Sequence, residues 1–110
     1  MAEVPTVESF RAAAIDYWQQ VREKSADRAN AASDEGDKIV AEWRRHGLAE
    51  ERLHGLLRDE SDEVRYAAAA QLGPADERAL SELRELTANP KGLVAPTARL
   101  LLTTWSKDRR

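Results

Sequence analysis

Residues 58–73 read RDESDEVRYAAAAQLG, and this stretch decides the fold. Its first six residues carry four carboxylates, which stabilise the positive N-terminal end of a helix. Ser61 is a good N-cap, and Gly73 followed by Pro74 is a strong stop signal. The four consecutive alanines allow neighbouring helices to approach closely. The stretch therefore predicts a turn and then a helix that begins at Asp62 and ends before Gly73.

The same pattern returns 30 residues later along the chain. At this offset apolar or turn residues coincide in six pairs, which are Leu53/Leu83, Leu56/Leu86, Asp59/Asn89, Val64/Val94, Ala68/Ala98 and Leu72/Leu102. A period of this length is typical of stacked helical hairpins. We therefore expect two repeats, over residues 48–73 and 74–105, with Asp59, Val64, Ala68 and Leu72 in structural roles.

Residues 5–47 predict a longer helical hairpin. Thr6 is the expected N-cap of its first helix, and the second helix should run from Ser25 to Gly47. The apolar stripe of the first helix is Val7, Phe10, Ala14, Tyr17 and Val21. Gly36 costs about 1 kcal/mol relative to alanine in a helix interior, so we expect it to permit close approach of the two helices.

Strand signals are almost absent, so the chain is expected to be all-α. The four shorter helices are expected over residues 49–58, 62–72, 74–88 and 94–105. Together with the long hairpin they predict one domain, residues 1–110, built as a six-helix right-handed α-α superhelix. Residues 106–110 are expected to be a flexible basic tail.

The segment LHGLLRDESDEVRYAAAAQL resembles a HEAT-type repeat. The resemblance implies that Asp59 and Arg65 bond between neighbouring units. The second copy has Asn89 and Ala95 in the equivalent places, so such a ladder should end after one rung. The layout of the whole chain, with VAEWRRHG ending the second helix, is similar to a small bacterial HEAT-like family classed only as a domain of unknown function. That similarity implies a fold and no activity.

Composition limits the classes of function. The chain has 17 Lys and Arg against 20 Asp and Glu, a net charge of −3, and a pI near 5.4. This balance argues against broad attraction to phosphate backbones. There is no cysteine, the start MAEVPTVESF is unlike a signal peptide, and no apolar run is long enough to span a bilayer. We expect a cytoplasmic protein without membrane association.

Catalytic and metal-binding patterns are weak. Glu51 and His54 have the spacing of one ligand pair of a di-metal site, but the second pair that such a site needs is missing. The acids of residues 59–63 lack the glycine and the alternating spacing of a calcium loop. With two histidines and no cysteine, no nucleophile is placed beside a base. We therefore expect no enzyme, no metal and no cofactor.

Binding is the remaining hypothesis. If Val64, Ala68 and Leu72 face inward, other residues of the second helices of the two repeats face a partner. Those candidates are Arg65, Tyr66, Ala69, Arg99, Leu100 and Thr103. Second helices commonly line the binding face of such arrays, so we predict a protein-binding module with an unidentified protein partner. The alternative for these residues is packing on helix ends or on a second copy of the chain in a homodimer.

Two further alternatives remain open at this stage. Nucleic-acid backbones could be gripped by a row of arginines, although the net charge disfavours it. These arginines are Arg44, Arg45, Arg65, Arg99, Arg109 and Arg110. Of the three tryptophans, Trp43 and Trp105 follow core spacing, whereas Trp18 fits either the core or its edge.

Overall fold

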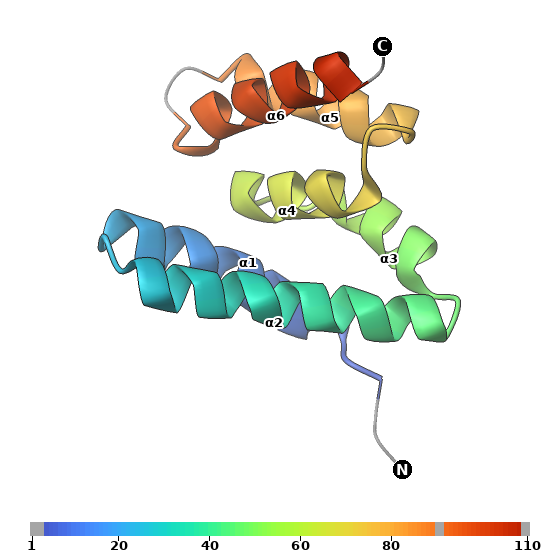
Figure 1. Ribbon diagram of the computed structural model, residues 1–110. Helices are drawn as coiled ribbons and strands as arrows, with labels where there is room; N and C mark the ends of the chain where they lie inside the picture. The colour runs from blue at the N-terminus through green and yellow to red at the C-terminus, as the bar shows by residue number, and fades with distance from the viewer. Residues whose placement is uncertain (1–3, 90–91, 109–110) are drawn as a thin grey trace. The chain divides into compact units, whose positions relative to one another are not determined.

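A computed structural model describes residues 4–89 and 92–108, with only the backbone of Asp108. Within this part of the chain there are six α-helices and no strand, so the predicted all-α class is confirmed (Figure 1). The helices are α1 (Val7–Arg22), α2 (Ala26–Arg45), α3 (Ala49–Leu56), α4 (Asp62–Leu72), α5 (Glu77–Thr87) and α6 (Val94–Asp108). None of these described helices has the length and apolarity that crossing a membrane requires. The chain divides into two compact units, Met1–Arg52 and Leu53–Arg110.

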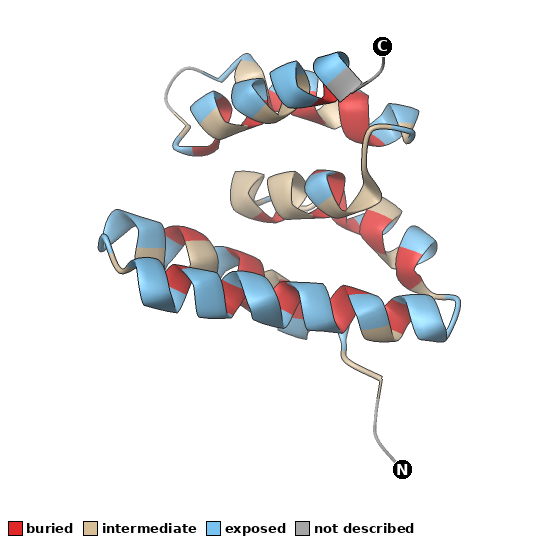
Figure 2. Ribbon diagram, in the orientation of Figure 1, coloured by how far each residue is buried: buried red, intermediate tan, exposed pale blue. Residues whose placement is uncertain are grey.

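The first unit is built on α1 packed against α2. Thr6 caps α1 as predicted, because its Oγ1 accepts a hydrogen bond from the Ser9 N–H at 3.1 Å. Ser25 precedes α2 without a side-chain capping bond. Each helix buries one face and exposes the other (Figure 2). The buried residues of the two helices are Phe10, Ala13, Ala14, Trp18, Ala29, Ala32, Gly36, Ile39, Val40 and Trp43.

Two predictions about these helices are wrong. Val21 is 37% exposed and Trp18 is buried in its place, because the 3.6-residue turn moves the core face toward Trp18 near the end of α1. Gly36 does not serve close approach, since a Cβ atom added there would come no nearer than 3.9 Å to Phe10 Cε1. That distance is ordinary van der Waals contact, so the site has room for alanine.

The carbonyl oxygen of Pro5 ties the N-terminal segment to the unit. It accepts a hydrogen bond from Trp43 Nε1 at 2.6 Å and another from Arg52 Nη1 at 2.9 Å. The Arg52 guanidinium also lies over the Trp43 ring, 5.4 Å from its centroid, and Phe10 contacts the same ring at 5.6 Å. A fully buried tryptophan thus has its polar N–H satisfied, as burial requires.

The second unit contains the end of α3 together with α4, α5 and α6, and each of the last three helices contacts the other two. The predicted bounds of α4 are confirmed. α5 begins at Glu77, three residues later than expected, because Asp76 is its N-cap and accepts from the Ala79 N–H at 3.0 Å. α3 ends at Leu56, two residues early.

α6 continues to Asp108, so residues 106–108 are helical and do not form the tail that was expected. Nothing in the sequence from Trp105 to Asp108 stops a helix, since it contains neither glycine nor proline. The last two residues of the predicted tail, 109–110, lie outside the described residues.

Burial follows the 30-residue repeat closely. Leu53 and Leu83 are 1% and 0% exposed, and the other apolar pairs also match. Both members are buried in the pairs Leu56/Leu86, Val64/Val94 and Ala68/Ala98, and both are half-buried in the pair Leu72/Leu102. Residues 30 positions apart in the sequence are therefore buried to a similar degree in these five pairs.

Candidate functional site

Ala69 was predicted to contact a partner, and the structure corrects this prediction. It is completely buried, as are its neighbours in the same face, Val64 and Ala68. α4 packs against both α5 and α6, so its buried arc is wider than a single stripe and includes Ala69. Ala69 therefore presents no surface to a partner, and Leu72 is half-buried at the end of the arc.

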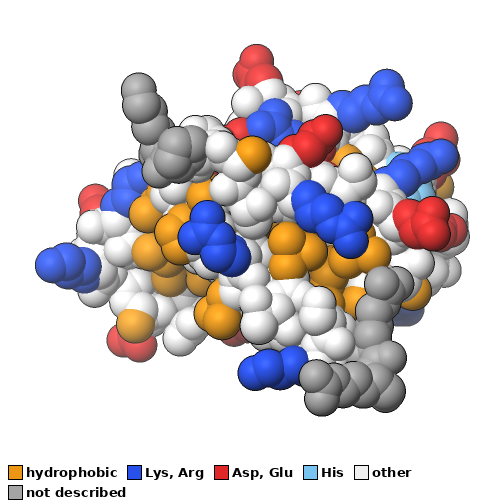
Figure 3. Space-filling view, turned by 90° about the horizontal axis from the view of Figure 1, so that it is seen from above, with side chains coloured by type: hydrophobic (Ala, Val, Ile, Leu, Met, Phe, Trp, Pro, Cys, Tyr) orange, Lys and Arg blue, Asp and Glu red, His pale blue; other side chains and the backbone are white. Residues whose placement is uncertain are grey.

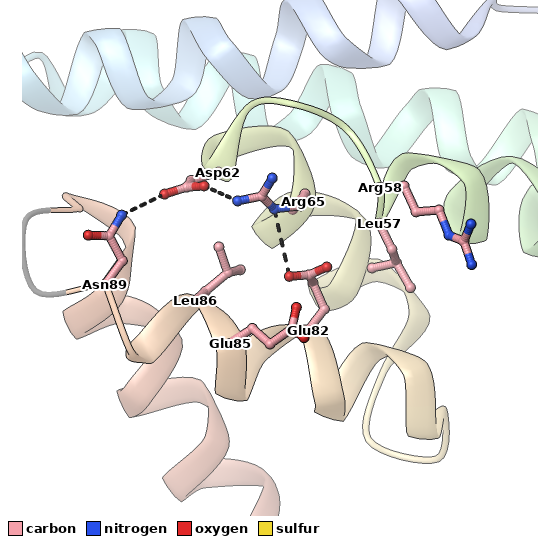
Figure 4. A pocket seen from close by; sticks show the side chains of 8 residues that line it. All are labelled: Leu57, Arg58, Asp62, Arg65, Glu82, Glu85, Leu86 and Asn89. Carbon is pink, nitrogen blue, oxygen red and sulfur yellow. Dashed lines mark hydrogen bonds and ion pairs between the residues drawn. The ribbon is translucent and has the colours of Figure 1, made fainter.

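Arg65 contacts residues of its own unit (Figure 4). Its Nη1 donates to the backbone carbonyl of Asp59 at 2.7 Å, and its Nη2 donates to Oδ1 of Asp62. The other carboxylate oxygen of Asp62 accepts from Asn89 Nδ2 at 3.3 Å. Asn89, which follows α5, is thereby bonded to the first residue of α4.

Glu82 on α5 completes this arrangement. Its Oε2 lies 3.6 Å from Arg65 Nε, which is an ion-pair distance but too long for a hydrogen bond. Arg65 Nε is buried and has no hydrogen-bond partner. Burial raises the pKa of Glu82 above its ordinary value, the positive charge of Arg65 opposes this, and Glu85 adds to the rise. The carboxyl group at this position is therefore easier to protonate than an exposed glutamate.

A shallow cleft of about 330 Å³ opens beside the Arg65 network (Figure 4). Its lining residues are Leu57, Arg58, Asp62, Arg65, Glu82, Glu85, Leu86 and Asn89. Arginines and carboxylates alternate along it, so the cleft has no single sign of charge. A second cleft, of about 380 Å³, shares Arg58, Glu82 and Glu85 with the first and reaches His54.

His54 is held by a carboxylate of its own unit. Its Nε2 lies 2.6 Å from Oδ2 of Asp76, and both side chains are largely buried. Burial alone would raise the pKa of Asp76, but hydrogen bonds from His54 and from the backbone N–H of Ala79 outweigh it and hold that pKa below its ordinary value. The pair joins α3 to the start of α5.

The weak metal patterns lead to no metal-binding geometry. Glu51 is exposed, whereas His54 is engaged with Asp76. In the acidic run, Asp59 Oδ2 accepts from the Ser61 N–H at 2.9 Å, and the Ser61 hydroxyl donates to Glu63 at 2.7 Å. Across the described part of the chain, no three His, Asp or Glu side chains are grouped so that they could hold a metal ion.

α6 carries the predicted contact residues that remain accessible. Arg99, Leu100 and Thr103 are all exposed. Leu100 is 67% exposed, far more than Leu93 at 41%, Ile15 at 38% or Val21 at 37%. The structure therefore separates the predicted set. Arg65 points toward α5 (Figure 4), whereas Arg99, Leu100 and Thr103 are exposed on α6.

The remaining candidates lie in mixed surroundings. Tyr66 is half-buried, and all three tryptophans, Trp18 included, are buried, so none is an exposed aromatic anchor. The proposed row of arginines is also interrupted. Arg45 pairs with Glu42 at 3.0 Å, Arg65 is held in its network, and Arg109 and Arg110 lie outside the described residues.

Sequence reasoning missed Asp76, Glu82 and the Pro5 carbonyl. Asp76 carried a readable signal, because an aspartate directly before a helical pattern is a common N-cap. The Pro5 contacts join residues 38 and 47 positions apart, and no local pattern reports such pairs. No family model, no curated protein and no solved structure matches the chain.

Proposed function

We propose that this protein is a non-catalytic protein-binding module whose partner docks on the solvent side of α6. Leu100 carries the proposal, because it is the most exposed large apolar side chain of the described residues. It lies on the side of α6 opposite the buried residues Val94, Ala98 and Trp105. Covering a leucine is worth roughly 1.5–3 kcal/mol, enough to anchor a contact.

The contact residues of the proposal are Arg99, Leu100 and Thr103. Arg65 is engaged within its own unit and Ala69 is buried, so neither belongs to the docking surface. Regulation or inhibition of the partner is the role that we propose for docking. We place the protein in the cytoplasm, where a chain without cysteine loses nothing to reducing conditions.

The same proposal includes the finer architecture. We propose that the six helices form a right-handed α-α superhelix of one long hairpin and two HEAT-like hairpins. The matched burial of the repeat pairs, such as Leu53 with Leu83, supports it. The bond from Asn89 to Asp62 is a second support, because it joins the two repeats at their turns. The resemblance to the bacterial HEAT-like family belongs to this part of the proposal.

The test is affinity capture from a lysate of the source cell, followed by titration with the purified partner. Leu100→Gln should raise the dissociation constant about tenfold or more, since it removes a leucine that the partner would bury. Ile15→Gln is the matched control, because it changes an exposed apolar residue of α1 and should leave affinity unchanged. Both variants must first show the circular dichroism and unfolding midpoint of the wild type. Equal affinity of Leu100→Gln and wild type would remove α6 as the docking surface.

A further inference from the structure

Four exposed residues form a continuous stripe along the solvent side of α6. Pro96, Leu100, Thr103 and Lys107 follow each other at spacings of four, three and four residues, so they lie on one side of the helix, and all four are exposed. We name these four residues the outer α6 stripe. At 1.5 Å per residue it is about 16 Å long, or three helical turns.

The threonine hydroxyl groups make this surface more apolar than its sequence implies. Thr103 Oγ1 donates to the backbone carbonyl of Arg99 at 3.0 Å, and Thr104 Oγ1 donates to that of Leu100 at 3.1 Å. Each hydroxyl proton is thereby used within the helix. Between Pro96 and Thr103 the outer α6 stripe therefore offers a leucine, a proline ring and the methyl group of Thr103.

The charged side chains of α6 from Val94 to Lys107 are both basic. The sequence from residue 86 to residue 107 contains no Asp or Glu, although the whole chain has 20 acids. Arg99 flanks the stripe and Lys107 ends it, and neither makes an ion pair with a described residue. Figure 3 shows a face on which blue basic and red acidic side chains surround orange apolar ones. A partner would therefore meet apolar surface and the positive charges of Arg99 and Lys107.

From this pattern we infer that the outer α6 stripe docks an acidic amphipathic segment of a different protein. The segment would place apolar side chains on Leu100 and Pro96, and carboxylates near Arg99 and Lys107. This inference rests on the proposed function and adds the chemistry of the partner to it. Charge complementarity of this kind selects the partner and speeds its association.

Two other occupants fit the surface less well. A two-fold symmetric dimer would bring the same patch of both copies together and oppose positive charges to positive charges. Nucleic acid would meet Arg99 and Lys107, but a phosphate backbone gains nothing from covering Leu100. Binding to duplex DNA through two cations would also be weak at physiological salt.

Photo-crosslinking tests the chemistry of the partner. Benzoylphenylalanine replaces Leu100, and in a control chain it replaces Ala70, an exposed residue of α4. After irradiation in lysate, mass spectrometry identifies the segment joined to each position. We expect position 100 alone to yield one protein segment with net negative charge and apolar side chains at helical spacing. A neutral or basic segment, a second copy of this chain, or nucleic acid would each overturn the inference.

Charge reversal separates this inference from the proposed function. The captured protein is purified for titration. The double variant Arg99→Glu, Lys107→Glu should bind it at least tenfold more weakly than wild type does. The wild-type affinity should also fall as the salt concentration rises. Arg78→Glu, Arg84→Glu on α5 is the matched control, because it makes the same change in net charge at two exposed positions outside the stripe. Unchanged affinity in the first variant, together with weak binding by Leu100→Gln, would overturn the acidic partner and leave the proposed function standing. Full affinity in Leu100→Gln would overturn both the acidic partner and the proposed docking on α6.

Discussion

Gly36 lies in the middle of α2, where glycine is costly and an added Cβ would make only an ordinary van der Waals contact with Phe10. We expect Gly36→Ala to raise the free energy of unfolding by about 1 kcal/mol, because alanine restricts the unfolded chain and is preferred in helices. Urea denaturation followed by circular dichroism measures it. A lower midpoint in the variant would mean that α1 and α2 need the glycine for their approach.

Gly73→Ala is the matched control, because it should lower the free energy of unfolding. Gly73 has φ +88° and ψ 175°, a conformation that is essentially restricted to glycine and costs other residues about 1–3 kcal/mol. Apart from its two chain neighbours, no described residue has an atom within 4 Å of an added Cβ, so the strain would come from the backbone conformation. We expect destabilisation here, in the same assay.

Asp76 provides a prediction of pH dependence. Its pKa is lowered in the folded protein, so folding favours the ionised form and gains stability above the ordinary value of 3.8. That stability is lost as pH falls through the lower, folded-state pKa. Asp76→Asn keeps the cap acceptor for Ala79 but removes the charge opposite His54. We expect wild type to be more stable than the variant at about pH 6, and the difference to shrink toward about pH 3.

A constant difference between wild type and Asp76→Asn across this range would contradict the charged pairing with His54. Asp76→Ala is the control, because it should cost about 1 kcal/mol more than the asparagine variant at every pH through loss of the cap. The effect of Glu82 on stability has the opposite pH dependence. Its pKa is raised in the folded protein, so its contribution to stability is present at low pH and is lost as pH rises. Comparing variants at one pH cancels that effect.

At the scale of elements, Arg65 joins α4 to the turn before it and to α5. We expect Arg65→Met to lower the free energy of unfolding by about 1–3 kcal/mol, because the bonds to Asp59 and Asp62 are lost while the methylene packing stays. Arg65→Lys should recover only part of this, since an ammonium group cannot replace the two-pronged guanidinium.

A double-mutant cycle distinguishes the two acidic partners of Arg65. Coupling with Asp62→Asn should exceed coupling with Glu82→Gln, because only Asp62 is within hydrogen-bond distance. Greater coupling to Glu82 would show that the ion pair to α5 contributes more to stability than the hydrogen bond within α4.

Local signals predicted the elements well where caps were explicit. α4 begins after Ser61 and ends before Gly73, as expected, and Thr6 is the N-cap of α1. Prediction failed at α5, where Pro74 was placed in the first turn although Asp76 provides the cap. It also failed for Ala69, because one helix of the repeat contacts two neighbours and a single stripe does not describe its buried arc.

For the candidate site, the sequence separated core from surface on α6 but not on α4. Leu100 is exposed as expected, because it lies opposite the apolar positions of its own helix. The engagement of Arg65 with Asp62 and Glu82 depends on how α4 and α5 meet, which no local pattern encodes. Tertiary contacts therefore bury Ala69 and engage Arg65, two of the six predicted contact residues.

For the whole molecule, the balance of charge predicts weak affinity for nucleic acid. The chain carries three more acids than bases, and Arg45 and Arg65 already have carboxylate partners. We expect no saturable binding of a fluorescein-labelled DNA duplex at about 0.15 M salt, measured by anisotropy. Saturable binding that weakens steeply with added salt would favour the nucleic-acid alternative over a protein partner.

The placement of the three tryptophans gives the protein an internal set of optical probes. Trp18 and Trp43 belong to the first unit and Trp105 to the second, and all three are buried. Solvent reaching a buried indole shifts its emission to longer wavelength, so each unit signals its own opening without a label. Fluorescence of a Trp105→Phe protein would follow the first unit alone. Comparison with the wild type would then show whether the two units melt together or one after the other.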